Sequence, residues 1–95
     1  ILKTPAANEF RSQEERGAEV RAIEPESALL SRGQQAMAAL SMVPLYGRID
    51  FVRNAADDFD VMELELIEPS LYLRMDPAAP ARFARAIDAW FQGEE

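Results

Sequence analysis

The chain has 95 residues, of which 48% are apolar, a net charge of −7, and neither cysteine nor histidine; it is therefore expected to form one small domain, residues 1–95, without disulfides, zinc–thiolate sites or an imidazole base. Its acidity disfavours a nucleic-acid partner, and no apolar run approaches the roughly 20 residues that span a bilayer, so we expect no membrane partner and a cytoplasmic location. Any catalysis would use carboxylates, arginines, backbone groups or a bound hard cation.

The N-terminal part is predicted to contain two short extended pieces joined by a polar loop. Residues 1–5, ILKTP, have the pattern of a strand end that is stopped by its proline. They carry no initiator Met and start as if already inside a strand, so we expect the chain to be a piece of a longer protein. Residues 6–19 are polar and predict an exposed loop, followed by a short extended piece around 20–23.

Two segments have the apolar spacing of amphipathic helices. Residues 26–41 follow a proline suited to a first helical turn, and residues 81–92 lie between Pro80 and Gly93. The expected core-facing positions are Leu29, Gly33, Met37 and Leu40 in the first helix and Phe83, Ala84, Ile87, Trp90 and Phe91 in the second. We expect Gly33 to mark a close packing contact.

Between the helices, residues 45–53 and 60–68 alternate with period two and predict a β-hairpin, with NAADD at 54–58 as its loop. The order strand, loop, helix, hairpin, helix predicts an α+β fold. In it, two helices pack on one face of a small antiparallel sheet.

The hairpin carries an unusual charge: seven carboxylates lie between Asp50 and Glu68, with Arg53 as the one cation inside that span. The aspartates at 57, 58 and 60 suit a turn. Strand alternation places the other side chains on two faces. The apolar face is expected to hold Gly47, Ile49, Phe51, Met62, Leu64 and Leu66, and the opposite face Arg48, Asp50, Val52, Val61, Glu63, Glu65 and Ile67.

The second face brings Asp50 opposite Glu63 or Glu65, and like charges so placed destabilise a sheet. Either this face is fully hydrated, or a divalent cation such as Mg²⁺, Mn²⁺ or Ca²⁺ occupies it, because oxygen ligands at this density suit hard cations. The flanking residues Tyr46 and Tyr72 are interpreted as rim residues of the core.

The motif RID, with Glu63 of the motif ELE thirteen positions after Asp50, resembles the metal-binding hairpin of the ATP-grasp ligases, whose pattern is Arg-x-Asp and then Glu-x-Asn. The upstream NEFRSQEERGA is similar to a loop of the same superfamily. The resemblance covers roughly residues 1–92 and implies the C-terminal half of an ATP-grasp fold. Glu65 departs from the usual Asn, and Ala18 from the second Gly of the loop.

The resemblance implies an ATP- and Mg²⁺-dependent (or Mn²⁺-dependent) ligase that joins a small-molecule carboxylate to an amine through an acyl phosphate. Asp50 and Glu65 would each bind one Mg²⁺ and Glu63 would bridge two, while Arg48 would stabilise the transferring phosphoryl group. In the same way, Arg11 would reach phosphate or acyl-phosphate oxygens and Met62 would line the adenine pocket.

Lys3 is expected either to contact phosphate or to be an exposed edge lysine. The segment alone is not expected to be active, so the rest of the same chain or a complementary subunit is an expected partner. The alternative is a non-catalytic acidic α/β interaction module, whose acidic face binds a basic partner or nothing.

Overall fold

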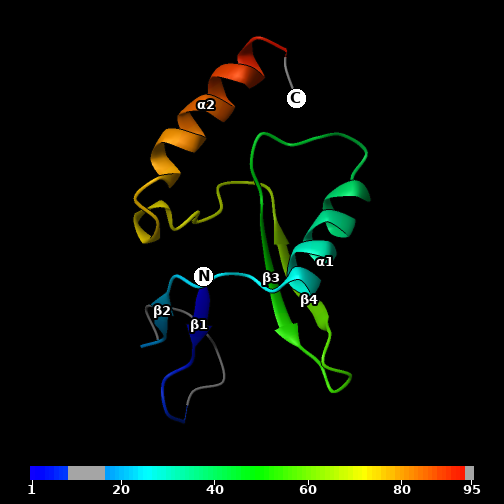
Figure 1. Ribbon diagram of the computed structural model, residues 1–95, viewed down its shortest axis with the longest axis vertical. Helices are drawn as coiled ribbons and strands as arrows, with labels where there is room; N and C mark the ends of the chain where they lie inside the picture. The colour runs from blue at the N-terminus through cyan, green and yellow to red at the C-terminus, as the bar shows by residue number, and fades with distance from the viewer. Residues whose placement is uncertain (9–16, 94–95) are drawn as a thin grey trace.

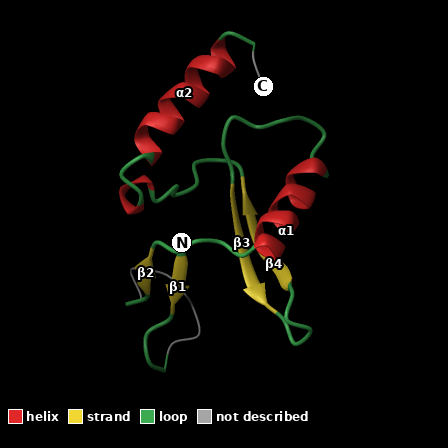
Figure 2. Ribbon diagram, in the orientation of Figure 1, coloured by secondary structure: helices red, strands yellow, loops and turns green. Residues whose placement is uncertain are grey.

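The computed structural model describes residues 1–8 and 17–93. Two antiparallel strand pairs, two α-helices and a short 3₁₀ helix make up the fold (Figures 1 and 2). In chain order the elements are β1 (Leu2–Thr4), β2 (Glu19–Arg21), α1 (Ser27–Ala38), β3 (Arg48–Arg53), β4 (Phe59–Glu65), the 3₁₀ helix η2 (Leu73–Met75) and α2 (Ala79–Phe91). The predicted α+β class is confirmed.

The strands form two separate two-stranded sheets, where the sequence predicted a single one. β1 pairs with β2 and places Lys3 opposite Val20. Pro5 follows β1 directly, and it cannot extend the ladder because proline has no N–H to donate. The predicted extended pieces on either side of the N-terminal loop are thus confirmed, and they pair with one another.

The predicted hairpin is confirmed, with strands β3 and β4 joined by residues 54–58. Asn54 organises this loop. Its side-chain oxygen accepts hydrogen bonds from the backbone N–H groups of Ala56 and Asp58 at 2.9 and 3.0 Å, and its amide donates to Asp60 at 3.1 Å. Asp57 has a φ of 60°, a left-handed conformation that aspartate tolerates better than most residues. Local hydrogen bonding of Asn and Asp therefore closes the hairpin.

A register shift between Asp50 and Phe51 changes the faces of β4 from those predicted. Asp50 pairs with Glu63 as expected, but Phe51 pairs with Val61, which leaves Met62 as the extra residue of a bulge. Val61 therefore shares the side of Phe51, where the sequence placed it with the carboxylates. Met62 is 68% exposed and does not belong to a covered apolar face.

Helix α1 lies against β4, and its predicted stripe is confirmed: Leu29, Gly33, Met37 and Leu40 are all partly buried. The expected close contact at Gly33 is wrong, because a Cβ there would meet nothing within 4 Å. Gly47 is the tight position instead. A Cβ at Gly47 would lie 2.8 Å from Met37 Cε and 2.9 Å from Leu66 Cδ2, so α1 packs closely on the chain that enters β3.

Two ion pairs fasten α1 to the hairpin. Arg32 pairs with Asp58 in the loop, and Arg53 at the end of β3 pairs with Glu26, which precedes the helix. The hydrogen bond from Arg32, together with that from the backbone N–H of Phe59, lowers the pKa of Asp58 to about 2. These contacts fix the rotation of α1 over the hairpin, since they join the helix to the far end of the strands.

The prediction that both helices pack on one face of the sheet is wrong, because helix α2 is set apart from the hairpin on which α1 packs (Figure 1). It packs on η2, and Phe83 meets the ring of Tyr46 edge-on, with ring centroids 6.2 Å apart. Asp76 supports the start of α2 by accepting from the backbone N–H of Ala78 at 2.9 Å and from Arg82 at 2.6 Å. Of the predicted core positions of this helix, only Phe83 is partly buried. The predictions for Ala84, Ile87, Trp90 and Phe91 are wrong, because these side chains are exposed, Phe91 to 81%.

The fold is open. Among the described residues no side chain is fully buried, and the structure exposes 7231 Å², against about 5,500 Å² for a folded monomer of this mass. The radius of gyration is 14.7 Å, against about 12 Å for a compact chain of this length. The apolar stripes of the two helices are thus only partly covered. Within the described ranges, neither helix has the length and apolar content needed to cross a bilayer.

Replacing Asn54 with Ala is expected to lower the free energy of unfolding by about 1–2 kcal/mol, because two backbone N–H groups lose their acceptor. Urea denaturation followed by circular dichroism measures this. Asp60→Ala removes only the acceptor of the Asn54 amide and keeps the bonds to the Asn54 oxygen, so it is expected to lose less. Equal losses in the two variants would contradict the role of that oxygen.

Replacing Arg32 with Gln is expected to raise the pKa of Asp58 from about 2 toward its ordinary value of 3.8, as an NMR titration of the carboxyl would show. A depressed pKa in the folded state stabilises the fold above the unfolded value, and this contribution is lost as the pH falls from there toward 2. Arg85→Gln, on the exposed side of α2, serves as the control and should leave Asp58 unchanged.

Candidate functional site

The predicted carboxylate face is assembled by the pairing of β3 with β4. Asp50 lies opposite Glu63, and Arg48 lies opposite Glu65. These two pairs are separated by the pair of Ile49 with Leu64, and because side chains alternate along a strand, the four residues lie on the same side of the hairpin. The sequence prediction that these residues come together is confirmed.

Arg48 is the centre of this group. Its Nε lies 2.9 Å from Asp50 Oδ1, and its Nη2 lies 3.3 Å from Asp50 Oδ2, 3.3 Å from Glu63 Oε2 and 2.9 Å from Glu65 Oε2. Its Nη1 donates to the carbonyl of Ser70 at 3.2 Å. One guanidinium thus contacts three carboxylates and joins the hairpin to the connector that follows β4.

The charge of Arg48 is held firmly in the positive state. Burial lowers its pKa, but the hydrogen bonds and charge of Asp50, followed by the charges of Glu65 and Tyr72, outweigh burial and raise the pKa above its ordinary value. The Arg48 side chain is 19% exposed, compared with 55% for Glu63. The arginine is therefore the covered member of the cluster, with the glutamates toward solvent.

A second cation reaches the cluster from the other sheet. Lys3 on β1 places its Nζ 3.4 Å from Asp50 Oδ2, with 19% of its side chain exposed. The alternative that Lys3 is an exposed edge lysine is therefore wrong. Three carboxylates now face two cations, so part of the negative charge that looked uncompensated along the hairpin is balanced by a residue 47 positions away.

Tyr72 lies beside these cations. The Nζ of Lys3 lies 5.2 Å from the centroid of its ring, the Cζ of Arg48 5.9 Å and the Cζ of Arg74 5.3 Å, all within the range of cation–π attraction. We call Tyr72 with Lys3, Arg48 and Arg74 the Tyr72 platform. Sequence reasoning placed Tyr72 at the rim of the core and missed it, because its role depends on three segments meeting in space.

The backbone of Tyr72 is also unusual. Its φ of 53° and ψ of 37° lie in the left-handed region, which costs a bulky residue free energy. The conformation occurs directly before η2 and turns the ring toward the cations of the platform. The surrounding contacts therefore hold Tyr72 in a position that its own backbone preference opposes.

Carboxylate oxygens are the ligand type that a hard divalent cation prefers, but the three carboxylates are not spaced to coordinate one. Oxygens of Asp50, Glu63 and Glu65 converge on Arg48 Nη2, as ligands would on a cation, yet Mg²⁺ requires oxygens at about 2.1 Å. Among the residues described, no three acidic side chains are spaced to hold a metal ion. The guanidinium occupies the point where the oxygens meet, so a metal would compete with Arg48 for them.

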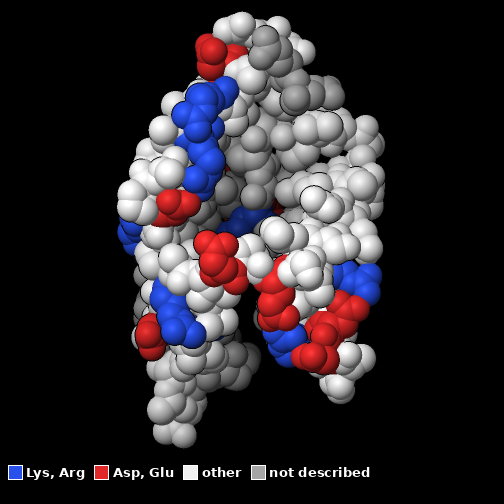
Figure 3. Space-filling model, viewed as in Figure 1, with Lys and Arg blue, Asp and Glu red and all other residues white. Residues whose placement is uncertain are grey.

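Two other predicted site residues stand apart from this cluster. Met62, expected to line an adenine pocket, is the bulged and exposed residue next to Glu63. Arg11 lies outside the residues that the structure describes. Figure 3 shows acidic and basic side chains mixed over the lower half of the molecule, with basic atoms at the bottom of the central hollow.

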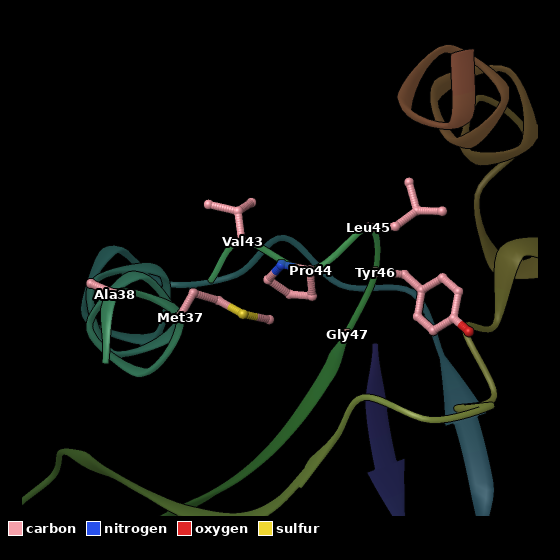
Figure 4. A pocket seen from close by; sticks show the side chains of 7 residues that line it. All are labelled: Met37, Ala38, Val43, Pro44, Leu45, Tyr46 and Gly47. Atoms are coloured by element: carbon pink, nitrogen blue, oxygen red, sulfur yellow. The ribbon is translucent and has the colours of Figure 1, made fainter. Parts of the chain in front are cut away.

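The described cavities lie elsewhere, beside the end of α1. One of about 410 Å³ is lined by residues of α1 and of the segment 43–47, where Met37 and Pro44 point toward one another (Figure 4). Another of about 530 Å³ extends from Leu45 to Leu66 and Trp90. Their linings are mainly apolar, so they offer packing surface and no charged chemistry.

No family model, curated protein or solved structure matches the chain. The site consists of three carboxylates, one central guanidinium, one lysine and one tyrosine.

Replacing Arg48 with Gln is expected to lower the free energy of unfolding by about 1–3 kcal/mol at pH 7, because three carboxylates lose their shared cation. The loss should shrink at high salt, where attraction between charges is screened. Chemical denaturation at low and high ionic strength measures it, with Arg85→Gln as the control. An equal loss at both ionic strengths would assign Arg48 a packing role only.

Proposed function

We propose that this chain forms the metal-binding hairpin segment of an ATP- and Mg²⁺-dependent ligase of the ATP-grasp type, which joins a carboxylate to an amine through an acyl phosphate. The observation that supports the proposal is the convergence of Asp50, Glu63 and Glu65 on one positive atom of Arg48. Such a point accepts either a guanidinium or a hard cation, since both are held by carboxylate oxygens.

Within this proposal, each side chain has a task that its chemistry suits. Asp50, Glu63 and Glu65 hold the cation, which neutralises phosphate charge when bound. Arg48, raised in pKa and so permanently charged, stabilises the charge that develops on a transferring phosphoryl group. Lys3 supplies a further positive charge 3.4 Å from Asp50.

Two further assignments of the ligase proposal rest on the sequence. Met62 contacts the adenine, and its exposed position on the bulge beside Glu63 leaves its side chain accessible to a nucleotide. Arg11 contacts phosphate or acyl-phosphate oxygens from the N-terminal loop. The remaining nucleotide contacts and the acid and amine sites belong to the rest of the same chain or to a complementary subunit.

The alternative of a non-catalytic acidic module is less favoured by the geometry. An acidic face that recruits a basic partner needs accessible, uncompensated carboxylates, but here Arg48 and Lys3 already contact Asp50 from two sides. The two functions differ in their dependence on Mg²⁺, which the following substitution tests.

In the complete protein, Glu63→Gln is expected to reduce Mg²⁺-dependent ATP turnover by roughly 100-fold, because the substitution removes a ligand charge, with little change in thermal stability. Coupled phosphate-release and thermal-melt assays measure both quantities. Glu24→Gln, the same change at an exposed loop position, is the matched control and should keep full activity. A folded Glu63→Gln protein with normal turnover would refute the ligase proposal.

A further inference from the structure

The two cavities beside the end of α1 form one continuous apolar surface. They share a wall, because residues 44–46 line both of them. From this wall the surface extends to α1 on one side and to the end of α2 on the other. We call the residues that line either cavity the apolar groove; they are Met37, Ala38, residues 40–47, Leu66 and Trp90.

The apolar groove carries no charge of its own. None of the residues that line it is acidic or basic, although 28% of the residues in the chain are charged. Figure 3 shows mostly uncharged atoms over the end of α1 and the segment 40–47. The chain as a whole has a net charge of −7, so two copies repel one another wherever their carboxylates come close. Contact through the groove keeps the carboxylates out of the interface.

The groove also combines a hollow with projecting apolar side chains. Met42 and Val43 are 69% and 55% exposed, and Met42 stands at the wall of the cavity of about 530 Å³ that Leu40 and Trp90 also line. In a two-fold dimer the same patch has to serve both copies, so it must contain a projection as well as a hollow that receives it. Methionine suits the projecting part because its unbranched side chain adapts to an irregular cavity.

The exposed area of the chain matches what such a dimer would cover. The structure exposes about 1,700 Å² more than a typical folded monomer of its mass. Obligate homodimers bury roughly 1,000–2,500 Å² on each copy, and their interfaces are more apolar than those of transient complexes. A second copy on the groove therefore accounts for the excess area and for its apolar character together.

We propose that the apolar groove is the contact surface of a two-fold symmetric dimer of this chain, in which Met42 and Val43 of each copy enter the hollow of the other. The driving force is the burial of apolar area. This interface is separate from the ligase proposal, because none of the residues assigned to the metal, the nucleotide or the phosphoryl group lines the groove.

The experiment is sedimentation velocity of the complete protein over a dilution series, in EDTA and without nucleotide. A dimer that dissociates on dilution is expected, and high salt should strengthen it, because salt screens the repulsion between two acidic copies. Hydrogen exchange measured at high and low protein concentration locates the contact. Residues 40–47 are expected to be the protected segment at high concentration.

Matched substitutions test the residues of the interface. Met42→Glu is expected to raise the dissociation constant of the dimer roughly 100-fold, since each of the two copies would bury an unpaired carboxylate. Leu30→Glu makes a similar change at an α1 residue that is 53% exposed and outside the groove, and it should leave the dimer intact. Circular dichroism checks the fold, and Val43→Glu is a second test at the rim of the groove.

Three results would overturn the inference. The first is a wild-type protein that stays monomeric at every concentration, because the groove would then be covered by something other than a second copy. The second is an equal weakening of the dimer by Met42→Glu and Leu30→Glu, which would assign the effect to added net charge. The third is a dimer that high salt dissociates, since this would show attraction between charged groups and not apolar contact.

Discussion

The contact of one guanidinium with three carboxylates is the interaction on which the hairpin and its surroundings depend. Asp50 and Glu63 face each other across β3 and β4, an arrangement that like-charge repulsion would open. Arg48 contacts both carboxylates and so offsets their repulsion. It also donates a hydrogen bond to the carbonyl of Ser70, which links the hairpin to the segment that follows β4. The hydrogen bond of Arg48 to Ser70 also brings Tyr72, two residues further along the chain, next to the Arg48 guanidinium.

A guanidinium and a divalent cation make similar demands on these carboxylates, but they are not equivalent. Arginine spreads one charge over a plane of donors at about 2.9 Å, whereas Mg²⁺ concentrates two charges and draws oxygens to about 2.1 Å. The fold described here has the more open arrangement that suits arginine. In the proposed ligase, the same three carboxylates contact Arg48 when no metal is bound and would coordinate the divalent cation when it binds.

The open core is the second constraint on this protein. α1 and α2 each present an apolar stripe, but the stripes do not pack on one another: Met37 and Ala38 of α1 line one cavity and Trp90 of α2 lines the other. The exposed area exceeds that of a typical folded monomer of this mass by about 1,700 Å². Little side-chain burial supports the local order, and directional contacts such as the ion pair of Arg32 with Asp58 and the hydrogen bonds of Asn54 set the position of the hairpin loop.

Local chemistry explains what the sequence by itself determined. Period-two alternation and the loop NAADD determined the hairpin and its carboxylate face, and the spacing of apolar residues determined both helices, because these signals act between residues close in the chain. Only the tertiary structure decided the contact of Lys3 with Asp50, the bulge that exposes Met62, the separation of the two sheets and the Tyr72 platform. Each of these features depends on which distant segments pack together. Long-range packing and charge interactions decide this, and they do not produce a periodic pattern in the sequence.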